Sequence, residues 1–194
     1  MTKETITLVA ALIAAAASLA TLVLKLIAEQ EAEARAAHRR ILGDAISDLG
    51  ETLHELMACS KIMVKTKSEE TFSKWETKAK DAQRRLNTIR VRLKYALWGL
   101  EAPLRTMTRV GSWTTHYRHD GKAADKFLQL ADILRQKIDL AVKSSYCSGN
   151  PPSLWRRWRA SVASDRVLDY YKNTAPSEDD EALDDIEGDV KGSK

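Results

Sequence analysis

One stretch near the N-terminus constrains this chain more than any other feature. From Ile6 to Ile27 the sequence reads ITLVAALIAAAASLATLVLKLI, in which Lys25 is the single charged residue. A helix of this length spans about 33 Å, close to the thickness of the hydrocarbon core of a bilayer. Lys25 lies near the end of the stretch, where its amine can reach the headgroups. The stretch therefore predicts a single transmembrane helix that anchors the rest of the chain.

Two other interpretations of this stretch stay open. Small residues between Ala14 and Ala20 fit the cleavage site of a signal peptide, but the apolar run continues to Ile27, which is long for such a peptide. The other is a buried core helix, because alanine-rich segments insert into membranes less readily than leucine-rich ones. We rank the anchor above the signal peptide, and both above the core helix.

The charges beside the anchor predict its orientation. Lys3 is the one basic side chain before it, whereas several basic residues lie at its C-terminal end or beyond it, namely Lys25, Arg35, Arg39 and Arg40. Basic residues are retained preferentially on the cytoplasmic side of a membrane. We therefore expect the N-terminus outside the inner (cell) membrane and the bulk of the chain in the cytoplasm.

Small residues recur along one face of the predicted anchor. They are Ala10, Ala14, Ala17 and Thr21, at spacings of four, three and four. Such a stripe lets transmembrane helices approach closely and associate. The simpler interpretation is that alanine is common in this stretch, so self-association through the stripe stays a hypothesis.

The composition predicts an all-α protein. Charged residues make up 30% of the 194 residues, and there are only eight glycines and four prolines, which favours long helices over strands and turns. We expect the transmembrane helix to be followed by a helical-hairpin or four-helix-bundle-like domain with long antiparallel helices. The predicted division is an anchor at 1–28, a helical stalk at 29–41, a cytoplasmic bundle at 42–175 and a tail at 176–194.

The predicted tail is acidic. It holds eight carboxylates and two lysines, so the rest of the chain is strongly basic although the net charge is only +4. Too few apolar residues occur there to form a core, which predicts disorder. We expect this tail to compete with anionic partners for the basic surface of the bundle.

Apolar residues at alternating spacings of three and four predict the helices of the bundle. The first continues from the stalk to about residue 66, with a seam that begins at Leu42. The second follows Ser68 and carries a coiled-coil-like seam from Phe72 to Leu100. The third runs over 120–147 and the fourth, shorter one follows Ser153. Residues 103–121, between the second and third helices, are expected to be irregular.

The second predicted helix carries a strongly basic face. Its main members are Lys74, Lys78, Arg84, Arg85 and Arg92. The simpler interpretation is a solvated face, which we rank first. The functional one is a surface for an anionic partner, either lipid headgroups or an acidic protein, with nucleic acid unlikely.

The segment expected to be irregular concentrates aromatic and histidine side chains. Trp113, His116, Tyr117 and His119 together predict a loop contact surface. Two histidines with Asp120 as the one nearby carboxylate make a weak metal site, so we expect no bound metal.

The fourth predicted helix begins with tryptophans among arginines. Trp155 and Trp158 fit a membrane interface, where an aromatic ring lies among headgroups. The alternative, which we hold as comparable, is that both tryptophans fill the seam of the bundle.

No catalytic motif is present in the sequence. A phosphate-binding glycine loop, a nucleophile elbow, a Cys-x-x-Cys pair and an His-Glu-x-x-His helix are all missing. Cys59 and Cys147 match no metal or redox spacing, which indicates free thiols. We therefore expect a protein that is no enzyme and needs no cofactor.

Two functions from different classes remain. The first is a noncatalytic, membrane-anchored interaction scaffold or adaptor that binds a protein partner or a second copy of itself. The alternative is a membrane-permeabilising effector of the phage-lysis, toxin or defence type, which oligomerises through the alanine-rich helix. A sensor domain outside the membrane is a third, weaker option and requires the opposite orientation.

Overall fold

The computed structural model describes residues 3–175, and this part of the chain is helical without any β-strand. The expected all-α class is confirmed. The elements are α1 (Lys3–Lys65), α2 (Glu69–Arg92), α3 (Glu101–Thr114), the short 3-10 helix η1 (Thr115–Tyr117), α4 (Gly121–Ser148) and α5 (Leu154–Thr174). The predicted acidic tail at 176–194 lies outside the described residues.

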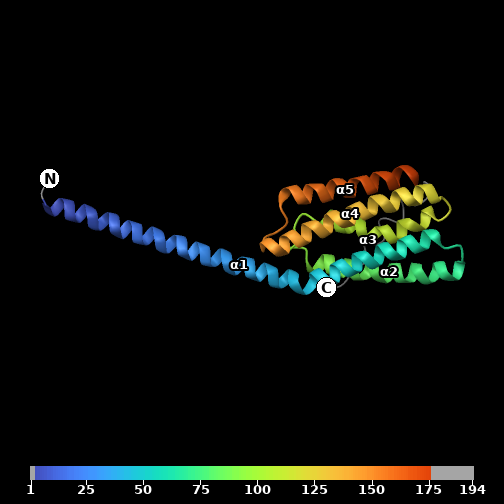
Figure 1. Cartoon of the computed structure of the whole chain (residues 1–194), viewed down its shortest axis with the longest axis horizontal. Coiled ribbons are helices and arrows are strands. Elements are labelled where there is room, and N and C mark those ends of the chain that lie inside the picture. The colour runs from blue at the N-terminus through green and yellow to red at the C-terminus, as the bar shows by residue number, and fades with distance from the viewer. Residues whose placement is uncertain (1–2, 176–194) are drawn as a thin grey trace, which may run out of the picture.

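The long helix α1 belongs to two environments. Its N-terminal part extends away from every other helix, whereas its C-terminal part packs among them (Figure 1). Leu22 and Leu24 are exposed, but Leu42 and Leu56 are fully buried. The helix continues without a break from the apolar stretch into the core. This continuity is what the sequence predicted for the anchor, the stalk and the first bundle helix.

Helix α2 reverses direction and runs back along α1. Ser68 caps it by accepting a hydrogen bond from the backbone N–H of Thr71, at 3.4 Å, which satisfies one free donor of the first turn. An ion pair between Arg85 and Glu55, with 2.8 Å between Nη1 and Oε2, joins the two helices midway. The short connection forces the two apolar seams to face each other.

The predicted extent of the second helix to Leu100 is wrong. Helix α2 ends at Arg92, and residues 93–100 form a compact turn in which Gly99 has a φ of 83°. The apolar spacing continued past the helix end because the turn buries its own leucines, Leu93, Leu97 and Leu100. A left-handed conformation such as that of Gly99 is disfavoured for residues with a Cβ.

The prediction that residues 103–121 are irregular is also wrong. Helix α3 occupies Glu101–Thr114, and Pro103 lies in its first turn, where proline loses no helical hydrogen bond. Leu104, Met107 and Val110 are buried on one face. Helix α3 contacts all four of the other α-helices. It is therefore a fifth member of the packed core.

Helices α4 and α5 complete the packing. Asp120 caps α4 by accepting from the backbone N–H groups of Lys122 and Ala123, at 3.1 and 3.0 Å. Gly149 ends it in the left-handed conformation, with φ 70°. Helix α5 buries small side chains, Ala160, Ala163 and Ser164, together with Val167. The predicted extents of both helices agree with the structure to within a few residues.

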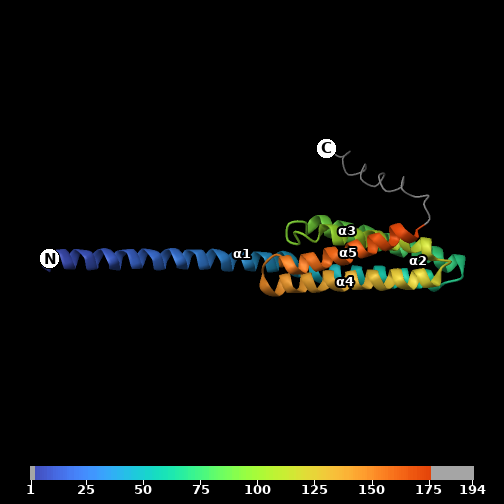
Figure 2. The same cartoon turned by 90° about the horizontal axis from the view of Figure 1, so that it is seen from above.

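The packed helices have two distinct ends. Figures 1 and 2 show that the turn at 93–100 and the α4–α5 connection lie toward the free part of α1. We call this the proximal end. The α1–α2 connection, η1 and the C-terminus of α5 lie at the opposite, distal end.

Candidate interaction surfaces

The apolar stretch of α1 is a continuous exposed surface. Every described side chain from Ile13 to Ile27 is exposed, including leucines, isoleucines and valine. Exposed apolar patches of this size are rare on soluble monomers. By length and composition, α1 is one helix that is able to cross a membrane.

The small-residue stripe lies within this exposed surface. Ala14, Ala17 and Thr21 are exposed, and the side chain of Ala10 lies outside the described residues. The Thr21 hydroxyl donates to the Ala17 carbonyl at 2.8 Å, and the Ser18 hydroxyl donates to the Ala14 carbonyl at 2.9 Å. Both hydroxyls are thus satisfied within α1. The stripe offers close approach of a second helix rather than hydrogen bonds to it.

The basic face of α2 is exposed along its whole length. Arg84 forms an ion pair with Asp81 at 3.4 Å, Arg85 pairs with Glu55, and the Lys78 amine lies 4.5 Å from the centre of the Trp75 ring. Lys74 and Arg92, at its two ends, are also exposed. The five predicted residues therefore share one accessible side, although acidic neighbours offset part of its charge.

A separate group of arginines, which the sequence did not predict, lies where α2 meets α3. Burial lowers the pKa of Arg90, and the guanidinium groups of Arg105 and Arg109 lower it further, although the Glu101 carboxylate opposes them. Arg90 donates twice to the Asn87 side chain, at 2.8 and 3.2 Å. Only the presence of a helix at 101–114 brings these arginines together. Their spacing could have indicated the cluster if α3 had been recognised.

Two of the four residues of the predicted loop contact surface are buried in the described structure, so they cannot form it. Trp113 and Tyr117 are 5% and 2% exposed and belong to the core. Trp113 stacks on Tyr171 with ring centroids 4.4 Å apart, and the Tyr117 hydroxyl lies 2.7 Å from the Thr174 hydroxyl. These contacts fasten α3 and η1 to the end of α5, because large aromatic rings gain most when fully buried.

The two histidines of this segment differ in burial. His116 is half-buried with its ring against the edge of Tyr171, 5.7 Å between centroids, while His119 is exposed. Neighbouring Arg118 forms a bidentate ion pair with Glu69, at 3.0 and 2.6 Å, which raises the pKa of Arg118 and lowers that of Glu69. Among the described residues no three potential ligands converge on a metal position.

Trp155 and Trp158 lie outside the core. They are 61% and 55% exposed and stack on each other, with ring centroids 4.8 Å apart. The prediction that they fill the seam of the bundle is wrong, because α5 turns its small residues inward instead. The membrane interface remains a prediction for this pair.

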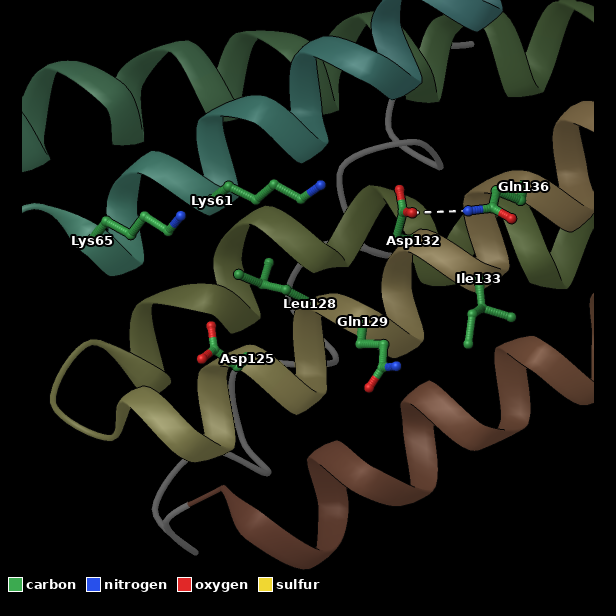
Figure 3. A pocket seen from close by; sticks show the side chains of 8 residues that line it. All are labelled: Lys61, Lys65, Asp125, Leu128, Gln129, Asp132, Ile133 and Gln136. Atoms are coloured by element: carbon green, nitrogen blue, oxygen red, sulfur yellow. Dashed lines mark hydrogen bonds between the residues drawn. The ribbon is translucent and has the colours of Figure 1, made fainter.

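A shallow groove of about 430 Å³ lies between α1 and α4 near the distal end (Figure 3). Lys61 and Lys65 line it from α1, and the other lining side chains come from α4. Burial raises the pKa of Asp132, but hydrogen bonds from Arg135 and Gln136, both 2.9 Å, outweigh this and lower it. The groove is open and its carboxylates are already paired or far apart, which indicates a solvated surface.

Two cysteines differ in accessibility. Cys59 is buried and Cys147 is exposed, and both are free. Burial raises the pKa of the Cys59 thiol, and the nearby Glu55 carboxylate adds to this. A raised pKa disfavours the thiolate, so the Cys59 thiol is a weak nucleophile.

Comparisons with protein-family models, with curated proteins and with solved structures found no match for this chain.

Proposed function

We propose that this protein is a noncatalytic, single-pass membrane scaffold whose N-terminal helix holds a helical bundle at the inner membrane surface. The observation that carries this proposal is the division of α1 into an exposed apolar part and a part that is buried in the core. One helix provides both the membrane segment and a helix of the packed core. Movement of one part is therefore transmitted to the other without a flexible joint.

The bundle offers partners surfaces rather than a reaction site. Its grooves are shallow, its described carboxylates and histidines do not converge, and the basic face of α2 is exposed. Such a surface recognises anionic partners, either an acidic protein segment or phospholipid headgroups. In this proposal the N-terminus lies outside and the bundle in the cytoplasm, and the basic residues at and beyond the C-terminal end of the anchor support this orientation.

Crosslinking of the full chain in native membranes tests the scaffold. The expected result is a defined crosslinked product that contains a second protein or a second copy. Charge reversal at Lys74, Arg84 and Arg85 weakens capture of a heterologous partner, whereas charge reversal at Lys122, an exposed residue of α4 outside this face, leaves it unchanged. Only monomeric, uncrosslinked chain across several linker lengths contradicts the scaffold.

A permeabilising effector is the second candidate, and the exposed stripe of Ala14, Ala17 and Thr21 is the observation that favours it. Close packing of copies through this stripe is the step that pore formation requires. Expression that collapses the membrane potential, and does so less after substitution of Ala14 and Ala17 by leucine, supports the effector. Overexpression without harm supports the scaffold.

A further inference from the structure

The proximal end of the packed helices carries an exposed cluster of tryptophan and arginine side chains. It is formed by Trp98 in the turn before α3 and by the first two turns of α5, and we call it the proximal collar: Trp98, Trp155, Arg156, Arg157, Trp158 and Arg159. All three tryptophans are more than half exposed, although tryptophan is costly to leave in water. We propose that the proximal collar docks on the anionic headgroups of the same membrane that α1 crosses; this inference rests on the proposed anchor.

The collar is a built structure and not a chance collection of side chains. The Arg157 guanidinium lies over the Trp98 ring, 4.3 Å from its centre, and joins the turn to α5. Gly99 has φ 83°, and a Cβ at this position would overlap the Arg157 side chain. The Arg159 guanidinium lies 5.8 Å from the centre of the Trp155 ring. Arginine stacked on exposed tryptophan gives a surface that is apolar in its body and cationic at its edge.

The charge of the collar favours an anionic surface over a second copy of the chain. Three arginines occur in the first two turns of α5, and no acidic residue follows before Asp165. Lys137 and Leu140 of α4 line a groove of about 280 Å³ beside Trp155, and Arg156 donates to the Leu140 carbonyl at 2.8 Å. Two such surfaces repel each other, whereas headgroups neutralise the arginines and shield the rings from water.

The position of the collar suits contact with the membrane. Gly149, at the end of α4, touches Arg35 of α1. Arg35 follows Ile27 by eight residues, so the end of α4 lies about 12 Å along the helix axis from the apolar stretch. The headgroup layer itself occupies roughly 5–8 Å of this distance.

A tilt of α1 closes the remaining gap. Transmembrane helices tilt on average by about 20° and by up to about 40°. Helix α5 packs on α4, which packs on α1, and each step displaces it by roughly 8–10 Å from the α1 axis. A tilt toward this side therefore lowers the collar onto the headgroups. The stalk glutamates Glu29 and Glu31 repel anionic headgroups only weakly, because each forms an ion pair. Their partners are Lys25 and Arg35, at 3.9 and 2.7 Å.

The distribution of tryptophans permits a direct test with the full chain. The first tryptophan in the sequence is Trp75, so no indole lies in the apolar stretch. The full chain is reconstituted in vesicles that contain phosphatidylglycerol, with or without lipids brominated near the headgroup. The ratio of fluorescence without and with bromine reports which indoles touch the membrane surface.

We expect bromine to quench the wild type, and the quenching to fall by about twofold or more when Trp98, Trp155 and Trp158 are replaced by phenylalanine. Trp75→Phe, at the distal end, is the matched control and does not lower the quenching, because it removes only an indole that bromine does not reach. Replacement of Arg156, Arg157 and Arg159 by glutamine, or a rise to 1 M salt, which shortens the Debye length to about 3 Å, also reduces it. Circular dichroism confirms that each variant keeps its helix content.

Alkaline extraction of the same vesicles separates the two proposals. A chain that is extracted contradicts the anchor and the collar together. A chain that is retained but shows no quenching, or equal quenching in the triple phenylalanine variant, contradicts the collar alone. Copy-to-copy crosslinks at Trp155→Cys without quenching would assign the collar to self-association and overturn the lipid proposal.

Discussion

At the scale of single residues, burial decides what the aromatic side chains do. Tyr95 is 87% exposed and Trp113 only 5%, yet both occur in segments that alternate polar and apolar residues. Trp113 stacks on Tyr171 at the distal end, while Tyr95 buries little of its surface. Sequence alone predicted a loop surface around Trp113, because clusters of aromatic and polar residues occur both in exposed contact surfaces and in buried helix packing.

Replacement of Trp113 by alanine tests its place in the core. We expect the free energy of unfolding to fall by about 3–5 kcal/mol, as for large core side chains generally. The matched control Tyr95→Ala should change it by less than about 0.5 kcal/mol, which is usual for exposed positions. Denaturant titration of both variants measures the difference. Equal small effects would restore the predicted loop surface.

We expect His38 to make the junction of α1 with α4 sensitive to pH. Its Nε2 lies 2.9 Å from the Ser145 hydroxyl, which donates to the Asn150 carbonyl at 2.6 Å. Burial lowers the pKa of His38 in the folded protein, so the unfolded chain binds the proton more readily. The contribution of His38 to the free energy of unfolding is therefore fully present above its unfolded pKa of about 6.5. It is lost as the pH falls below this value towards the folded pKa.

His38→Gln checks this pH dependence. Thermal unfolding of the wild type should shift to lower temperature between about pH 7 and pH 5, and the shift should be smaller in the variant. His119→Gln is the control, because His119 is exposed. An identical pH profile in wild type and His38→Gln contradicts the role of this junction.

At the scale of elements, helical periodicity predicted the packing faces of the helices more accurately than it predicted the helix ends. The seams of α1 and α4 were identified correctly, since a continuous helix keeps one phase over its whole length. The seam assigned to α2 ran on to Leu100 because Leu93 and Leu97 of the following turn are also buried. Helix α3 was missed because it is short, and Pro103 and Gly111 interrupt its pattern. Tertiary packing against four helices, which the sequence does not display, selects the helix there.

Two glycines provide a matched test of this turn. Gly99 has φ 83° and lies against Arg157, whereas a Cβ at Gly50 would meet no atom within 4 Å. Gly99→Ala should destabilise the fold by at least about 1–2 kcal/mol, because left-handed backbone is costly for alanine. Gly50→Ala should stabilise it by up to about 1 kcal/mol, since alanine favours the helix interior. Equal shifts in the unfolding midpoint would contradict the turn at 93–100.

At the scale of the whole molecule, the arrangement follows from α1. Because the apolar part of α1 continues directly into the packed core, the orientation of the bundle is fixed relative to the apolar part. The proximal end therefore faces the environment that surrounds the apolar part. The sequence predicted the anchor and the basic face of α2, because both are set by local composition. It also predicted Trp155 and Trp158 as a membrane interface, but it could not predict that Trp98 joins them in the proximal collar. Trp98 and Arg157 are far apart in the chain and meet only through the turn at 93–100.

The native cysteines allow the central claim to be measured directly. Cys147 is exposed on the bundle and Cys59 is buried, so a membrane-impermeant maleimide reports the location of Cys147 in the otherwise unaltered chain. We predict that the protein resists alkaline extraction from cell membranes and that Cys147 is labelled only after the membrane is opened, while Thr2→Cys is labelled in intact cells. Labelling of Cys147 in intact cells, or release of the chain by alkali, would contradict a bundle anchored at the cytoplasmic surface.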